Sequence, residues 1–183
     1  DRERAGFFEA MGDVLAGIRA FHNRSLQAIL DSACPDRDRE TVRRELLEAL
    51  QRVPIHPART FYEAMVAANF LYYLDGCDSL GRFDQDLGPY YERDVSAGQI
   101  SSEEAERLVR VLWENVDAAS GWNVALGGSR PDGSSAYRAF TLVCLRAAKS
   151  IRRPNLALRV RGDMPEEVFG AAPFAQTPEH RRA

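Results

Sequence analysis

Several features that would assign the chain to a large class of proteins are missing. The longest apolar run, residues 64–74, is shorter than the roughly 20 residues that cross a bilayer, and no signal peptide opens the chain. The net charge is −3, and acidic residues are interleaved with the 24 basic ones. Lys149 is the only lysine, which we attribute to a GC-rich coding bias. We therefore expect neither a membrane nor a nucleic-acid partner.

Cysteine and histidine are also scarce. The three cysteines are an odd number without motif spacing, which argues against a disulfide framework and a zinc site. The three histidines have no carboxylate or cysteine at ligand spacing, so we expect no metal ion. A reducing cytoplasm is the expected compartment.

The remaining composition is that of an ordinary globular protein. Of the 183 residues 45% are hydrophobic and 28% are charged, which suits one domain with a sizeable core. The first residue is Asp1 rather than Met, so we expect the chain to be a piece of a longer protein.

Apolar residues recur at helical spacing through much of the chain. They predict a helix over residues 5–31 and a second helix that Asp36 caps. A stiff connector with two prolines, residues 53–59, leads to a third helix. Thr60 can cap that helix, and Glu63 stands at the capping-box position as its reciprocal acceptor.

The later part of the chain alternates helices with two short strands. Ser101 with Glu104 predicts a capping box, and a further helix is expected over residues 134–150. Residues 121–128 read as a short buried strand and residues 155–160 as a second strand, and we expect the two to pair in parallel. Two strands do not make a complete sheet, so the fold looks like part of a larger α/β body.

The third helix and the C-terminal residues have distinct sequence patterns. The third helix, FYEAMVAANFLYYL, is apolar nearly all round, which is typical of a helix in the middle of a larger body. A capping segment at residues 163–166 predicts a last helix. Residues 171–183 have two prolines and no periodicity, so we expect them to be a disordered tail or foreign to the fold.

Four blocks of sequence resemble a known family. These are VPIHPARTFYEA, DSLGRFDQ with PYYERDVSAGQISSEEAERL, NVALGG with PDG, and RRPNLALRVRGDMPEEVF. In this order they resemble the pyruvate formate-lyase-like domain of glycyl radical enzymes. The resemblance covers residues 51–170, and residues 1–50 are interpreted as a helical lead-in of the same domain.

The resemblance implies a helix-rich α/β fold that is one piece of a ten-stranded α/β barrel. It implies a radical lyase, a dehydratase or a formate C-acetyltransferase, with GRFDQ closer to the lyase and dehydratase branch. In that family a radical-SAM activating enzyme installs a glycyl radical, which passes to a cysteine inside the barrel. The implied partners are a small-molecule substrate, the activating enzyme and a second copy in a homodimer.

The resemblance also implies which catalytic parts are missing. The family's thiyl loop, Gly-Cys-x-Glu, and its glycyl loop, Arg-Val-x-Gly-Tyr, lie downstream of the blocks matched here. We therefore expect no catalytic residue and no bound cofactor in this chain, and no activity from the chain alone. Asp86, Gly88 and the short stretch between Trp113 and Asn123 depart from the family pattern, which leaves the subgroup open.

Ser79 is the best candidate for a substrate contact. The resemblance places the serine of SLGR at the border of the substrate cavity, with Cys77 and Asp78 near its wall. Gly76, Cys77 and Asp78 superficially mimic the thiyl loop, but they precede GRFDQ and so occupy the wrong place in the family order. A purely structural role for Ser79 stays open.

Arg82, Asp84 and Gln85 are interpreted as a structural polar network beneath that cavity. A buried arginine and carboxylate can form a strong bidentate pair, which is how we expect Arg82 and Asp84 to interact.

Three interpretations of the whole chain remain. It is a fragment of a glycyl radical enzyme, or one chain of a split enzyme of that kind. The third is a non-catalytic helical interaction module that has kept the family's core.

Overall fold

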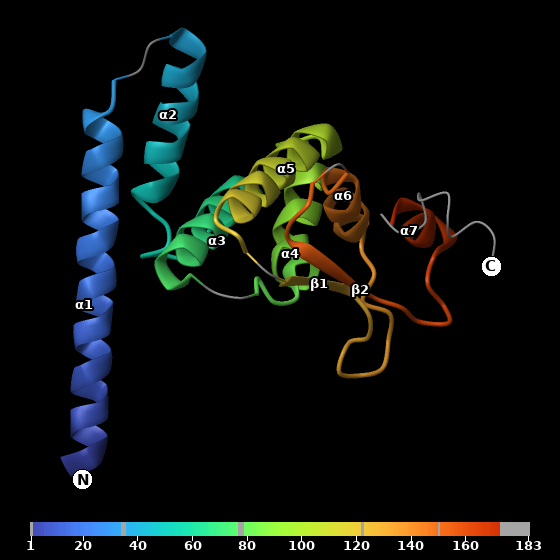
Figure 1. Cartoon of the computed structure of the whole chain (residues 1–183), viewed down its shortest axis with the longest axis horizontal. Coiled ribbons are helices and arrows are strands. Elements are labelled where there is room, and N and C mark those ends of the chain that lie inside the picture. Colours follow the sequence, from blue (N-terminus) through green and yellow to red (C-terminus); the bar gives the residue numbers. More distant parts are fainter. Residues whose placement is uncertain (1, 34–35, 77–78, 122, 150, 173–183) are drawn as a thin grey trace. The chain divides into compact units, whose positions relative to one another are not determined.

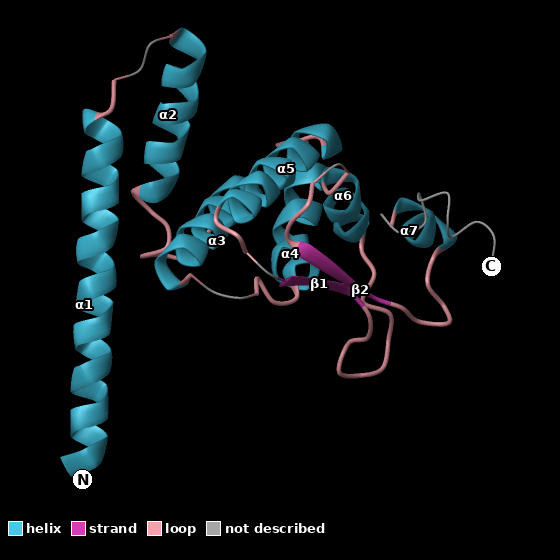
Figure 2. Cartoon of the chain, in the orientation of Figure 1, coloured by secondary structure: helices cyan, strands magenta, loops and turns pink. Residues whose placement is uncertain are grey.

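The computed structural model describes residues 2–33, 36–76, 79–121, 123–149 and 151–172. The chain divides into two compact units, Asp1–Ala58 and Arg59–Ala183. Helices predominate in both units, and the strands belong to the second (Figure 2). The helix-rich α/β class predicted from the sequence is confirmed.

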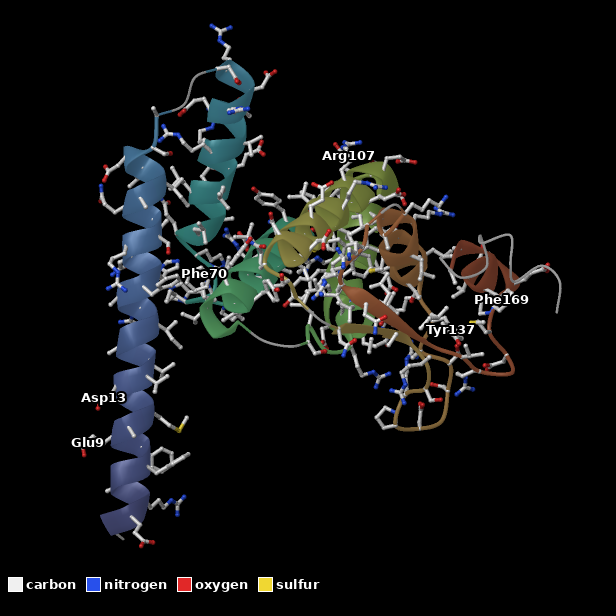
Figure 3. All side chains as sticks on the ribbon, in the orientation of Figure 1. Glu9, Asp13, Phe70, Arg107, Tyr137 and Phe169 are labelled. Atoms are coloured by element: carbon white, nitrogen blue, oxygen red, sulfur yellow. The ribbon has the colours of Figure 1, made fainter. Side chains whose placement is uncertain are left out.

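Two helices form the first unit, α1 (Arg2–Asp31) and α2 (Arg37–Leu50). The Asp36 side chain accepts a hydrogen bond from the Arg39 N–H at 2.8 Å, which confirms the predicted cap. Glu9 and Asp13 project from the same side of α1 (Figure 3). Several large apolar side chains in the first half of α1 are exposed: Phe7, Phe8, Met11, Val14 and Leu15.

His22 ties the two helices of this unit together. Its side chain is buried, and its Nε2 lies 2.7 Å from the Leu50 carbonyl oxygen and 3.2 Å from that of Val53. Leu50 is the last residue of α2, where backbone acceptors lack partners within the helix, and Val53 lies in the turn that follows. His56, in the connector after α2, is exposed.

The second unit contains seven of the described elements. They follow in the order α3 (Phe61–Asp75), α4 (Phe83–Ser96), α5 (Ser102–Ala118), β1 (Asn123–Gly127), α6 (Ala139–Ala147), β2 (Asn155–Arg159) and α7 (Glu166–Ala171). The strands β1 and β2 are parallel neighbours, with Asn123 paired to Asn155 and Gly127 paired to Arg159. The connection through α6 makes this a βαβ unit (Figure 1). Both predicted strands are therefore confirmed.

An aromatic cluster forms the core of the second unit. Phe61, Phe83 and Trp113 are each at most 2% exposed. The ring centroids of Phe83 and Trp113 are 4.9 Å apart, and Phe140 lies 5.2 Å from Phe61 and 5.1 Å from Tyr91. These rings come from α3, α4, α5 and α6, so burial of the cluster fixes the helices on one side of the sheet.

The start of α3 is held by two carboxylates. The Thr60 side chain accepts from the Glu63 N–H at 3.1 Å, as predicted. The Glu63 carboxylate binds the Arg59 N–H at 2.6 Å and the Arg59 guanidinium at 2.8 Å, one residue before the position expected of a capping box. The buried Asp94 accepts from the Phe61 N–H at 2.6 Å. A long-range carboxylate therefore supplies part of the predicted local cap.

The helix expected over residues 134–150 is shorter in the structure. The Asp132 carboxylate accepts from the Ser134 N–H at 3.0 Å, and Ser129 pairs with Ser135 in an antiparallel bridge. These contacts hold the Pro-Asp-Gly turn of residues 131–133 and keep its flanks extended, so α6 begins only at residue 139.

Part of the expected tail belongs to the fold. Ala171 is the last residue of α7, and Ala172 is fully buried. Residues 173–183 lie outside the described part of the chain, so the expectation about them stays a prediction.

Candidate functional site: the open face of the sheet

The two faces of the β1–β2 sheet are chemically different. Val124 and Leu126 of β1 are at most 1% exposed, and they pair with Leu156 and Leu158 of β2. Successive side chains of a strand point to opposite faces, so this apolar face packs under the helices. The alternate positions form the other face, which is the more exposed one on β2. We call this second face the open face.

A polar row crosses the open face at the beginning of the strands. Ser79 forms a parallel bridge with Asn123, and Asn123 is paired in register with Asn155. Asn155 Nδ2 donates to Asn123 Oδ1 at 2.9 Å. Ser79 Oγ accepts from the Gly81 N–H at 3.1 Å, which leaves its hydroxyl hydrogen directed elsewhere. Ser79 and Asn155 are exposed and Asn123 is half-buried.

The segment that carries Ser79 behaves as a short third strand. The Leu80 N–H donates to the Asn123 carbonyl at 3.0 Å, and the Gly81 carbonyl accepts from the Ala125 N–H at 2.9 Å. Backbone pairing therefore places the SLG residues beside β1, on the side opposite β2.

Small residues and one arginine complete the open face. Ala125 pairs with Ala157 in the middle, and Gly127 pairs with Arg159 at the far end. A Cβ on Gly128 would lie 3.0 Å from Arg159 Cβ and 3.1 Å from its Nε, so the stem of Arg159 packs closely against this glycine. The face therefore has a polar end, a floor of methyl groups and a cationic end.

Asp84 binds the end of β1, at the cationic end of the open face. It is fully buried, and its Oδ2 accepts from the Gly127 N–H at 2.9 Å and from the Thr141 hydroxyl at 2.5 Å. Thr141 Oγ1 in turn accepts from the Arg138 N–H at 3.0 Å. One carboxylate at the start of α4 thus joins the end of β1 to the first turn of α6.

The neighbours of Asp84 bind elsewhere. Arg82 donates to the Ser129 carbonyl at 2.9 Å, and Gln85 donates to the Ala136 carbonyl at 2.5 Å. Within the described part of the chain no ion pair joins Arg82 to Asp84, so the expected bidentate pair is not formed. Arg82, Asp84 and Gln85 instead bind different residues of the segment 127–141.

Arg161 stabilises the turn that follows β1. It binds the Asp163 carboxylate at 2.7 Å and donates to the Gly133 carbonyl at 2.8 Å. Its hydrogen bonds and charge lower the pKa of Asp163, and Asp163 in turn raises the pKa of Arg161. Tyr137, labelled in Figure 3, donates its hydroxyl to the Arg159 carbonyl at 2.7 Å. Burial raises the pKa of Tyr137 above its usual value.

Cys144 is unsuited to nucleophilic chemistry. It is fully buried in α6, and burial together with the nearby charge of Asp84 raises the pKa of its thiol well above the usual value. Cys77 and Asp78, two of the predicted substrate contacts, lie outside the described residues. Ser79 is thus the one predicted contact that the structure places on the open face.

The sequence analysis missed Asn123, Asn155 and Arg159. The apolar positions of the two strands predict the buried face and carry no signal for the alternate positions. The signal available was the shared pattern of the two strands, because NVALG and NLALR each begin with asparagine and have alanine two residues later. Their register, which aligns these positions, is a property of the tertiary structure.

No group of three His, Cys, Asp or Glu side chains among the described residues could hold a metal ion. A search of the same residues finds no helix long and apolar enough to span a membrane.

A family model described as pyruvate formate lyase-like matches residues 1–172. The chain belongs to this family. The match includes α1 and α2, which precede the four blocks of resemblance, and ends at the buried Ala172.

Curated relatives of this pyruvate formate lyase-like chain include glycyl radical enzymes of several activities. It is 29% identical over 199 residues to an isethionate sulfite-lyase of Desulfovibrio desulfuricans, covering 92% of this chain and 24% of the relative. It is 26% identical to the 4-hydroxyphenylacetate decarboxylase glycyl radical subunit of Clostridioides difficile, covering 91% of this chain and 21% of that subunit. The chain therefore spans about a quarter of the length of the relatives that it matches.

Solved structures show the same fold. One concerns 1,2-propanediol dehydration in Roseburia inulinivorans and superposes with a TM-score of 0.70 at 22% identity, covering 84% of this chain and 22% of that chain. A glycyl radical enzyme from Archaeoglobus fulgidus gives a TM-score of 0.68 at 20% identity, with the same coverage. The likeness shows that this chain shares its fold with a part of each of these proteins.

Proposed function

We propose that this chain forms part of the substrate-facing wall of a glycyl radical enzyme that acts on a small organic molecule. The single observation that carries the proposal is the open face of the sheet. Helices cover one side of β1 through the buried Val124 and Leu126, while the other side carries Ser79, Asn123 and Asn155 in one row.

The chemistry of that face suits a wall better than a core. A face that packed against another layer of protein would carry large apolar side chains, as the opposite face does. Here Ala125 and Ala157 leave a shallow floor, and exposed amides and a hydroxyl stand beside it. Such a surface can bind and orient a ligand of modest size while its backbone stays rigid.

The reaction class is proposed from the relatives. They include a sulfite-lyase, decarboxylases and dehydratases, each of which removes a group from a small molecule. We propose a reaction of this lyase kind for the complete enzyme. A glycyl radical, installed by an activating enzyme, would supply the chemistry, and a homodimer is the proposed assembly.

We propose that this chain binds the ligand and shields the reaction from water. Asp84, Thr141 and Gly127 hold the end of β1, so the open face keeps its position when a ligand binds. The helices behind the sheet exclude water from that side, as a radical reaction requires. No residue of the chain is assigned as a radical carrier.

The direct test is to sequence the coding DNA on both sides of this chain and translate every forward frame. We expect further sequence of the same family that contains Gly-Cys-x-Glu and Arg-Val-x-Gly-Tyr. The complete protein, incubated anaerobically with an activating enzyme, should then give a glycyl radical signal by electron paramagnetic resonance. A sample without the activating enzyme is the control.

Adjoining DNA that encodes neither loop in any frame would overturn the enzymatic proposal. A complete protein that contains both loops but never forms the radical would overturn it as well.

A further inference from the structure

Two buried polar atoms at the start of α4 have complementary chemistry and no partner. Among the described residues, Arg82 Nε and Asp84 Oδ1 are buried and form no hydrogen bond. The Arg82 Nε–H is a donor, and the carboxylate oxygen of Asp84 is an acceptor. Because Asp84 is fully buried, bulk solvent does not reach its second oxygen. Leaving such an atom unpaired costs the desolvation of a charged group, so buried polar atoms in native proteins are almost always paired.

The other polar atoms of these two side chains are bound to one short segment. Asp84 Oδ2 accepts from the Gly127 N–H at 2.9 Å, and Arg82 Nη2 donates to the Ser129 carbonyl at 2.9 Å. Gly127 and Gly128 are buried and Ser129 is half-buried. Both side chains therefore end beside the same three residues, with an unpaired donor on one and an unpaired acceptor on the other.

The first turn of α4 supplies further donors. Arg82 is the N-cap of this helix, and its side chain makes no capping hydrogen bond. The first N–H groups of a helix have no partner within it. Phe83 and Asp84 are the first two residues of α4, and both are buried, so their N–H groups also need an acceptor.

The charges at this point favour a neutral ligand that both donates and accepts. An anion would meet the Asp84 carboxylate, and a cation would meet the Arg82 guanidinium. A water molecule can accept from a donor and donate to an acceptor at once. Buried waters typically bind polar groups that would otherwise be unpaired, and they form about three hydrogen bonds each.

We propose that one water molecule is held between Arg82 Nε and Asp84 Oδ1 as a fixed part of the fold. It accepts a hydrogen bond from Arg82 and donates one to Asp84, and the start of α4 offers it a further N–H. The water joins the two side chains into one network that holds residues 127–129. The inference goes beyond the proposed function, because it assigns a bound molecule to the interior of the chain and not to the open face.

The test is an NMR measurement on the complete 183-residue chain, labelled with nitrogen-15. A rotating-frame Overhauser experiment correlates the water signal with each N–H proton, and the sign of a peak separates a held water from hydrogen exchange with solvent. We expect an Overhauser peak, opposite in sign to the diagonal, between water and the Arg82 Nε–H. Arg93 Nε binds Asp94 at 2.9 Å and Arg161 Nε binds Asp163 at 2.7 Å, so both should lack this peak.

Variants assign the signal and the acceptor. Arg82→Lys has no Nε and identifies the resonance by its loss. In Asp84→Asn the side-chain oxygen must serve the Gly127 N–H, so the water faces an amide nitrogen and has no acceptor for its own hydrogen. We expect the Overhauser peak at Arg82 to be lost in this variant.

Thr141→Val is the matched control. It removes the hydroxyl that binds Asp84 Oδ2 at 2.5 Å and leaves Oδ1 unchanged, so the Overhauser peak at Arg82 should remain. Dispersed spectra verify that each variant is folded, and the measurement on the unchanged chain depends on none of them.

Two results would overturn the proposal. One is an unchanged chain in which the Arg82 Nε–H gives only an exchange peak with water, or no peak, because the site would then be open to solvent or closed by a direct bond to Asp84. The other is an equal Overhauser peak in Asp84→Asn and the unchanged chain. Neither result depends on the radical loops, so failure here is distinguishable from failure of the enzymatic proposal.

Discussion

Replacing Gly127 by alanine tests how closely the end of β1 is packed. Gly127 has φ of 66°, and Gly98, after the end of α4, has nearly the same φ of 67°. A Cβ at Gly127 would lie 2.4 Å from Cε1 and 2.6 Å from Cδ1 of Tyr137, whereas a Cβ at Gly98 meets nothing within 4 Å. The two substitutions therefore share a backbone cost and differ in steric contact.

The expected magnitudes follow from these terms. The left-handed conformation costs alanine roughly 1–2 kcal/mol, and reduced freedom of the unfolded chain returns about 0.4–1 kcal/mol. Gly98→Ala should therefore lower the free energy of unfolding by about 1 kcal/mol. Gly127→Ala must also displace the Tyr137 ring, which loses its hydrogen bond to the Arg159 carbonyl, worth about 0.5–1.5 kcal/mol. With some lost packing of the ring, the total should reach about 3 kcal/mol.

Urea unfolding followed by tryptophan fluorescence measures this difference. Trp113 is fully buried in the second unit, so its signal reports on the unit that contains the substitutions. Tyr137→Ala in the Gly127→Ala background should cost little more, because the contacts of the Tyr137 ring are already lost there. Equal destabilisation by Gly98→Ala and Gly127→Ala would refute the reasoning, and so would strict additivity with Tyr137→Ala.

Two further predictions concern helix ends. His22→Phe keeps a ring in place but leaves the Leu50 and Val53 carbonyls without their donor, so the first unit should lose about 1–3 kcal/mol. Urea unfolding followed by circular dichroism at 222 nm measures this, and His56→Phe, at an exposed site, should change stability by less than about 0.5 kcal/mol. An effect of His22→Phe no larger than that of His56→Phe would contradict the role of His22. The backbone and hydroxyl of Ser101 lower the pKa of Glu104 below its usual 4.5. Because the folded value is the lower one, this stabilisation is present above pH 4.5 and is lost as the pH falls through the lowered pKa. In the same urea unfolding experiment, Glu104→Gln should therefore lower the free energy of unfolding more at pH 7 than at pH 3. At pH 7 its effect should also exceed that of Glu103→Gln, which removes a charge from the same turn. A pH-independent difference between the two variants would count against the capping box.

Features set by neighbouring residues were predictable from the sequence. The side chains of Asp36, Thr60 and Ser101 accept hydrogen bonds from the backbone N–H three residues later, as their spacing predicts. The two strands were also predicted, because the residue pattern of a strand acts over a few positions. The family followed from the order of four sequence blocks and is confirmed by the match over residues 1–172.

Contacts between distant residues were not predictable in this way. The sequence suggested that Arg82 would pair with its near neighbour Asp84, but each finds a partner more than 40 residues away. The helix α6 begins later in the chain than predicted, because Asp132 and Ser134 bind each other in the turn that precedes it. The substrate role of Ser79, and of Cys77 and Asp78, stays a prediction.

The sequence by itself determined the class of fold, the family and most helix starts, because each depends on residue order over short spans. Only the tertiary structure decided which side chains lie on the same surface. Parallel pairing brings Asn123 beside Asn155 and Gly127 beside Arg159, 32 positions apart in the chain. That register depends on the packing of α4, α5 and α6 behind the sheet, where Asp84 joins α4 to the end of β1. The open face therefore exists only in the folded chain.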